Sequence, residues 1–204
     1  MAAESVELDG ARVGQEVGTP GKVVATNSRV DGTVTGKRVR LVDCVVRGNV
    51  VGTNVILENC VVLGIATAGR SLTIEDSLCY TFRGQQETEL SNATVLLPQA
   101  IADGPLTLET PVAVAGLGRL KLAADDDSEA ELPTMDAADR YEQDGTTYLT
   151  LAPRILNLRK VTDRLAELEE GVMAAVDDTS GSDAELSVEE VLSKLDVSHD
   201  AVAT

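Results

Sequence analysis

The side chains best placed for chemistry in this sequence form a regularly spaced series of Asn and Asp residues. The series is Asn27, Asp43, Asn59, Asp76 and Asn92, with intervals of 16 or 17 residues. Oxygen ligands in a row could hold a metal ion, and carboxylates could act as general acids. Asn and Asp also accept the left-handed backbone conformation of tight corners and bond the neighbouring backbone there. We favour the corner interpretation, which makes these five residues structural.

The three cysteines predict neither a disulfide framework nor a zinc site. Cys44, Cys60 and Cys79 are odd in number and include no Cys-x-x-Cys pair. Cys44 and Cys60 occupy one repeated position that continues as Ser77 and Ala93, which indicates packing of small side chains. Cys79 stands where neighbouring units carry valine, so we expect three buried, inert thiols.

Other catalytic constellations are missing from the sequence. The only histidine, His199, lies near the end of the chain, whereas metal-dependent hydratases and hexapeptide-repeat transferases depend on histidine ligands or bases. The stretch Gly116-Leu-Gly118 lacks the third glycine and the Lys-Ser/Thr pair of a phosphate-binding loop. We therefore expect a protein that is not an enzyme, with no catalytic residues, no cofactor and no metal.

An internal repeat positions the Asn and Asp series. Residues 41–46 read L-V-D-C-V-V and residues 57–62 read L-E-N-C-V-V, and looser copies start at positions 8, 25, 74, 90 and 106. Most units are therefore 16 or 17 residues long. Glycines recur at two further positions that we also interpret as corners: Gly32, Gly48 and Gly64 at one, and Gly36 and Gly52 at the other.

Repeats of this length predict one coil each of a parallel β-helix. A unit of 16–17 residues is too short for a helix pair or a propeller blade, and its alternating runs are bounded by Gly or Asn. Stacked coils place equivalent residues about 4.8 Å apart, which explains the columns of like residues. The predicted fold is all-β: a parallel, right-handed β-helix of about six to seven coils, followed by a β-strand flap and a C-terminal α-helix.

Changes of pattern divide the chain into four segments. These are a β-helix at 1–117, an acidic insertion with a strand pair at 118–152, a heptad-patterned helix at 153–176, and a linker with a short amphipathic tail helix at 177–204. In the insertion we expect an antiparallel flap in which Leu120 and Leu122 pair with Leu149 and Leu151. A short helix is expected around Met135–Glu142.

Apolar residues of the predicted helix recur in steps of three and four: Leu158, Val161, Leu165, Leu168 and Val172. Such a seam packs against another surface. Two interpretations stay open, since the helix could cover an end or face of the β-helix or could mediate association with a partner. The tail helix opens with a capping box from Ser187 to Glu190 and is either a partner-docking element or a frayed end.

Charge limits the partners and the compartment. The formal net charge of −17 argues against nucleic acid and against an anionic membrane surface, which both require Lys and Arg. No apolar stretch approaches about 18 residues, so we expect no direct membrane insertion. The acidic start without an apolar run predicts a cytoplasmic protein. Few lysines among many acids are typical of salt-loving cells, where salt screens self-repulsion.

The coils resemble those of bactofilins. Residues 47–56, R-G-N-V-V-G-T-N-V-I, resemble a coil of that family with its G-x-V-x-G-x-x-V pattern, and residues 30–36 and 63–69 are weaker copies. The resemblance covers about residues 8–112 and implies a cytoskeletal β-helix protein that polymerises end to end without nucleotide. Together with the acidity it points to the archaeal halofilin type, which affects cell shape. Two departures are the C-terminal helix and the loss of glycine at Thr81 and Leu97.

The leading hypothesis is a cytoskeletal scaffold that self-assembles into homo-oligomers or filaments. Terminal coils present apolar side chains and unpaired backbone to another chain. The candidate contact residues are Val6, Leu8, Val13 and Val17 in the N-terminal coil, and Leu106, Leu108, Val112 and Val114 in the C-terminal coil. The alternative is a soluble adaptor or filament-capping regulator that binds a membrane-associated or cytoskeletal protein through its C-terminal helices.

Overall fold

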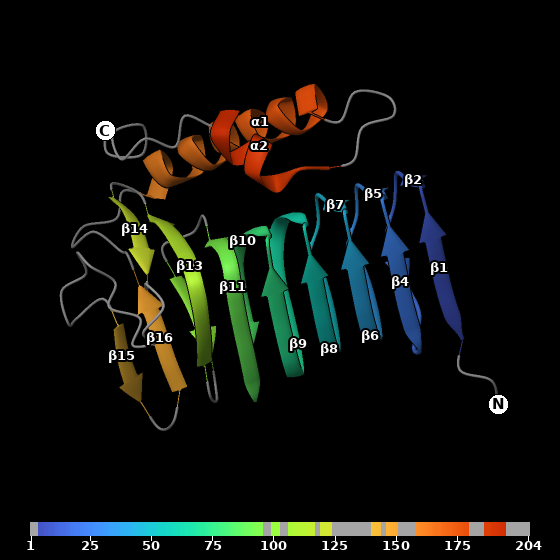
Figure 1. Ribbon diagram of the computed structural model, residues 1–204, viewed down its shortest axis with the longest axis horizontal. Helices are drawn as coiled ribbons and strands as arrows, with labels where there is room; N and C mark the ends of the chain where they lie inside the picture. Colours follow the sequence, from blue (N-terminus) through green and yellow to red (C-terminus); the bar gives the residue numbers. More distant parts are fainter. Residues whose placement is uncertain are drawn as a thin grey trace.

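The strands of the chain stack as a parallel β-helix of about six coils (Figure 1). The computed structural model describes residues 4–95, 99–102, 106–116, 119–123, 140–143, 146–150, 158–179 and 186–194, with side chains at 4–95, 169–179 and 186–194. We number the coils 1 to 6 and count each from the first residue of its first strand. These first residues lie in register and are Ser5, Lys22, Arg38, Asn54, Ser71 and Glu87. The predicted architecture of 16- to 17-residue coils is therefore confirmed.

Each coil contributes one strand segment to each of three faces. Face A consists of β1 (Ser5–Asp9), β4 (Lys22–Thr26), residues 38–42 of β6 (Val34–Val42), 54–58 of β8 (Val50–Glu58), 71–75 of β9 (Val61–Glu75) and 87–91 of β11 (Glu87–Val95). Face B consists of β2 (Arg12–Val13), β5 (Arg29–Val30), β7 (Val45–Val46), 61–62 of β9, 78–79 of β10 (Leu78–Gly84) and 94–95 of β11. Face C consists of β3 (Val17–Gly18), residues 34–36, 50–52, 66–68 and 82–84, and β12 (Gln99–Ala102).

Aliphatic columns fill the interior of the coils. Leu41, Leu57, Ile74 and Leu90 lie in register one above the other and are each at most 1% exposed. Burial of each such side chain contributes about 1.5–3 kcal/mol. Because stacked side chains are nearly alike in size, every coil can keep the same cross-section, and the core needs few aromatic residues.

The Asn and Asp series lies at the corner between faces A and B. Asn27, Asp43, Asn59, Asp76 and Asn92 all have positive φ, between 44° and 53°. Gly10 holds the same corner of coil 1 with a φ of 59°. The backbone N–H groups of Gly10, Asn27, Asp43, Asn59 and Asp76 bond upward to the next coil, for example from Asp43 to the Glu58 carbonyl at 3.0 Å. The left-handed conformation therefore turns the chain without breaking the ladder between coils.

At the corners of coils 2 to 5 the side chain of the next residue, Ser28, Cys44, Cys60 or Ser77, bonds a backbone group. Ser28 accepts a bond from the Ala11 N–H at 3.0 Å, and Ser77 accepts one from the Cys60 N–H at 2.9 Å. Ser28 also donates to the Thr26 carbonyl at 2.8 Å, and Cys44 donates through sulfur to the Val42 carbonyl at 3.1 Å. This small-residue column thus satisfies inward-pointing backbone groups in addition to filling space.

Glycine occupies the corner between faces B and C because adjacent coils touch there through backbone. A Cβ placed on Gly48 would lie 2.5 Å from the carbonyl carbon of Gly32, and one on Gly32 would lie 2.6 Å from the carbonyl carbon of Gln15. Above Gly64 the register shifts between Cys79 and Thr81. Thr81 therefore lies opposite Ile65 and is not in the glycine column.

The unit after coil 6 departs from the predicted register. Leu108, and not Leu106, lies opposite Leu90, whereas Leu106 lies opposite Thr88. Leu90 and Leu108 are 18 residues apart in the sequence, whereas the repeat predicted a spacing of 16. The chain therefore contains two additional residues before this point of β13 (Leu106–Gly116).

The predicted flap pairing is wrong, because each strand forms a local hairpin instead. β14 (Arg119–Ala123) returns antiparallel along β13, which places Leu120 opposite Ala115. β15 (Arg140–Gln143) pairs with β16 (Thr146–Thr150), which also runs antiparallel to β12 (Gln99–Ala102). Two-residue connections, including Asp144-Gly145, favour hairpins over distant pairs.

Residues 140–142 are strand, so the helix expected around Met135–Glu142 is not formed there; residues 135–139 and Leu151 lie outside the described part. The helices of the described part are α1 (Leu158–Thr179) and α2 (Val188–Lys194). The predicted start of the first helix at residue 153 also lies outside the described residues, and its end extends beyond residue 176 to Thr179.

We predict that Gly48→Ala destabilises the protein by about 1–3 kcal/mol, because the added methyl group meets the backbone of Gly32 and neither coil can move without breaking the ladder. Gly14→Ala is the matched control, since nothing lies within 4 Å of a Cβ at that position. Urea unfolding of both variants measures the difference. Equal stability of the two variants would contradict the close approach of coils at this corner.

Candidate assembly interface

The N-terminal coil is an open end of the stack. Within the described residues β1 pairs only with β4, β2 only with β5, and β3 only with β6. Each of the three strands therefore has one edge without a backbone partner there. Unpaired parallel edges attract another strand, so this end is a template for association.

Apolar side chains of coil 1 are incompletely covered at this end. Val6, Leu8 and Val13 are partly buried and pack against the core, while Val17 is 8% exposed. Their counterparts one coil higher, Val23 and Val30, are at most 1% exposed. The structure thus brings together the four N-terminal residues that the sequence predicted as contacts, on one surface that lacks the next layer.

The C-terminal end is covered in part by strands that run back along it. Val112 and Val114 lie opposite Ala93 and Val95 on one side and opposite Ala123 and Lys121 of β14 on the other. Their strand edge is therefore not open, contrary to the expectation, because the chain reverses direction and fills it. Leu106 and Leu108 pair with coil 6, and among the described residues their other strand edge has no partner, whereas β16 fills the edge of β12.

Face B carries a second apolar surface, which points outward. Val45, Val61 and Leu78 are each at most 6% exposed, although Val46, Val62 and Cys79 fill the interior of the same strands. Helices α1 and α2 cover this surface and bury Val172, Val176, Leu186, Val188 and Val191 against it. In Figure 1 the helices lie along the side of the coils and not across an end.

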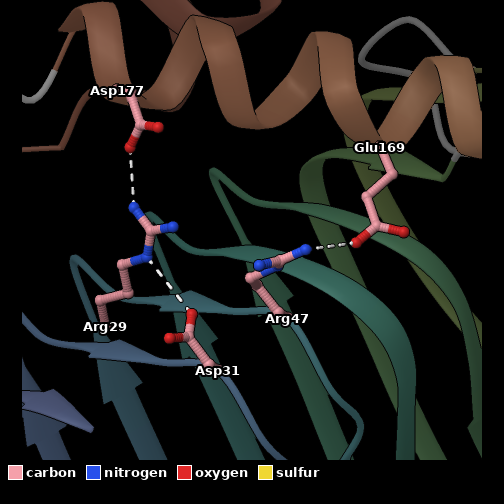
Figure 2. Close-up of polar contacts among 5 residues, drawn as sticks. All are labelled: Arg29, Asp31, Arg47, Glu169 and Asp177. Carbon is pink, nitrogen blue, oxygen red and sulfur yellow. Dashed lines mark hydrogen bonds and ion pairs between the residues drawn. The ribbon is translucent and has the colours of Figure 1, made fainter. Parts of the chain in front are cut away.

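Two arginines of the coils hold α1 by its acidic residues (Figure 2). Arg29 bonds Asp177 at 2.7 Å and Arg47 bonds Glu169 at 3.0 Å. Glu169 raises the pKa of Arg47, and burial raises the pKa of the neighbouring Tyr80 to about 12. Exposed pairs of this kind contribute about 0–1 kcal/mol each, so the apolar contact supplies most of the binding and the charges fix the position of the helix.

The corner residue Asn59 holds the segment that enters α2. Its side-chain nitrogen donates to the Asp43 carboxylate at 2.6 Å and to the Leu186 carbonyl at 2.5 Å, and its side-chain oxygen accepts from the Val188 N–H at 3.2 Å. Ser187 caps the helix by accepting from the Glu190 N–H at 3.3 Å. Asn59 is therefore both a corner and a docking residue, a role that the sequence analysis missed.

The predicted helix seam is described only in its last member. Val172 is fully buried on face B, whereas the side chains of Leu158, Val161, Leu165 and Leu168 lie outside the described part. The sequence did hold a signal for this contact. On face B the outward position changes from Arg12 and Arg29 to valine and leucine in coils 3 to 5.

The three cysteines are free and buried. Burial raises the pKa of Cys60 well above its ordinary value and that of Cys79 to about 12, so both thiols stay protonated. The hydrogen bond with Cys60 lowers the pKa of Cys44, which is itself 1% exposed. Among the described residues no group of three or more His, Cys, Asp or Glu could hold a metal ion, and no helix is long and apolar enough to cross a membrane.

We predict that Asn59→Gly speeds amide hydrogen exchange in Val188–Lys194 by about tenfold, because it removes the side chain that bonds Leu186 and Val188 while keeping positive φ accessible. Asn27→Gly is the control, since Asn27 has the same backbone conformation and no described contact with this segment. Equal exchange in the two variants would show that Asn59 does not hold α2.

Comparison of the chain with protein-family models, with curated proteins and with solved structures found no match, so its function is argued from the geometry of these surfaces.

Proposed function

We propose that this protein is a non-enzymatic scaffold that self-assembles through its open N-terminal coil. The observation that carries the proposal is the contrast between the two ends of the stack. Within the described residues coil 1 leaves three strand edges without partners and Val6, Leu8 and Val13 half-covered, whereas at the other end β14 and β16 fill two edges and only the Leu106–Glu109 part of β13 has an edge without a partner. A second copy supplies the missing layer of backbone bonds and apolar cover.

The geometry favours an end-to-end contact between like ends. If only the N-terminal end accepts another chain, two copies meet through the same surface, which is an isologous contact with a two-fold axis. A two-fold axis perpendicular to the stack sets β1 of one copy antiparallel to β1 of its partner. Antiparallel pairing satisfies the backbone groups of both edges. Such an assembly closes as a dimer, and growth into a filament needs displacement of β14 and β16.

A second candidate function is the capping of a filament that another β-helix protein forms. The partly covered C-terminal end favours it, because β14 and β16 occupy two of the strand edges that a further coil would need there. In this case the N-terminal coil binds an open coil of the partner. An adaptor that works through free C-terminal helices is less well supported, since the described parts of α1 and α2 bury their apolar residues on face B.

The biological setting follows from the resemblance to bactofilins and from charge. We propose a cytoskeletal role in the cytoplasm, in cell shape or spatial organisation, with proximity to the membrane only through a protein partner. A net charge of −17 suits the salt-rich cytoplasm of a halophilic archaeon, because salt at high concentration screens the repulsion between copies.

We predict that Val13→Asp weakens self-association at least about tenfold, because the contact would bury an unpaired carboxylate. Sedimentation velocity over a range of protein concentrations measures the association. Val51→Asp is the matched control, with the same change on face C at a residue that is 36% exposed in the middle of the stack. Leu8→Asp repeats the test on face A of coil 1, and circular dichroism verifies that each variant is folded. Unchanged association in both coil 1 variants would refute assembly through this end.

A further inference from the structure

The outer surface of the open N-terminal edge is acidic. On β1 the side chains of Val6 and Leu8 pack against the core, whereas Ser5, Glu7 and Asp9 are exposed on the outer side of face A. Within the described residues neither carboxylate takes part in an ion pair. Figure 1 shows β1 as the outermost strand of its face. Charged side chains on such an edge oppose the approach of another strand.

The adjacent coil presents no carboxylate at the matching positions. Glu7 lies opposite Val24, and Asp9 lies opposite Thr26. The remaining outward side chain of coil 2 on face A is the cation Lys22. A single copy therefore sets no like charge opposite the two acids. Repulsion across the free edge of β1 arises only when a second acidic strand lies beside it.

The end contact proposed above supplies such a strand. A two-fold axis that is perpendicular to face A and passes through Glu7 pairs all five residues of β1 with the partner's β1. Val6 then lies opposite the partner's Leu8 on the inner side of the sheet. On the outer side Glu7 lies opposite the partner's Glu7 and diagonal to the partner's Asp9. The Cβ atoms of directly opposite residues are about 5 Å apart, and like charges in that position destabilise the pairing.

Ionic strength determines how far this repulsion reaches. The Debye length is about 10 Å at 0.1 M salt and about 3 Å at 1 M, and the separation of about 5 Å between opposite side chains lies between these lengths. Each copy brings two carboxylates and the cation Lys22 to this part of face A, so negative charge remains in excess at the junction. The junction therefore repels at low salt and loses most of that repulsion in molar salt.

We propose that Glu7 and Asp9 form an electrostatic gate, which lets the N-terminal ends associate at high ionic strength and keeps them apart at low ionic strength. This inference rests on the proposed end contact, whose regulation it describes. In molar salt the apolar contact of Val6 and Leu8 and the new backbone bonds outweigh the screened repulsion. The gate differs from the general repulsion between chains of net charge −17, because it depends on two positions of β1.

The test compares two full-length variants that have the same net charge. The edge variant combines Glu7→Gln with Asp9→Asn. The control combines Glu75→Gln with Glu87→Gln, which removes two exposed carboxylates from face A in coils 5 and 6. Sedimentation velocity measures the dissociation constants of both variants and of the parent over a series of KCl concentrations. Circular dichroism restricts the series to concentrations at which all three chains are folded.

At the low end of the series, about 0.1 M KCl, the edge variant should associate at least about tenfold more tightly than the control. At about 2 M KCl the two dissociation constants should agree within about twofold, because the carboxylates of the control are then screened at the junction. General repulsion and any effect of KCl on apolar contacts are common to the two variants. The difference between them therefore measures the gate.

Two results would contradict these expectations, and they are distinguishable. Association of the edge variant with the same salt dependence as the control would overturn the gate and leave the end contact standing. Absence of association in all three chains at every salt concentration would refute the end contact, and the gate with it.

Discussion

Parallel stacking of coils requires each corner to occur at the same place in every turn, and the rest of this structure depends on that requirement. A coil bonds to its neighbours only if its strands lie in register about 4.8 Å above the last. The positive φ of Asn27, Asp43, Asn59, Asp76 and Asn92 turns the chain between faces A and B, while the N–H groups of the first four stay in the ladder. Residues with a branched Cβ would be strained there.

The alternation of Asn and Asp at this corner has an electrostatic reason. Stacked side chains at a spacing of one coil would repel if each were a carboxylate. Amides separate the carboxylates instead, and Asn59 and Asn92 each donate to the aspartate one coil below at 2.6 Å. In coil 4 the same amide is shared with the incoming tail segment. The corner column thus links the stability of the stack to the position of the C-terminal helices.

The stack of coils has an N-terminal and a C-terminal end, and the proposed assembly depends on the structure of these two ends. Regular repeats could be predicted from the sequence because stacking repeats the same environment, which selects the same residue types in columns. The register after coil 6 could not be predicted, because two additional residues before Leu108 end the repeat and no local sequence pattern marks them. The pairing of β14 with β13 could not be predicted either, because antiparallel strands do not place like residues in columns that a sequence comparison would reveal.

The contact on face B shows a different limit of sequence reasoning. Val45, Val61 and Leu78 are apolar, although their neighbours Val46, Val62 and Cys79 already fill the interior. Strict alternation along a strand would have assigned them to the outside. An outward valine column then requires a cover, and the C-terminal helices supply it. The role of Asn59 could not be read from the repeat, because every coil carries an equivalent residue.

Hydrogen exchange of β1 as a function of protein concentration tests the central claim most directly, because only an end contact gives new partners to the open edge of coil 1. The account predicts that amides in Ser5–Asp9 exchange more slowly as concentration rises, while those in Val50–Glu58, which are already paired on both sides, do not change. Exchange in Ser5–Asp9 that is independent of concentration, in a sample that does associate, would contradict assembly through the N-terminal coil.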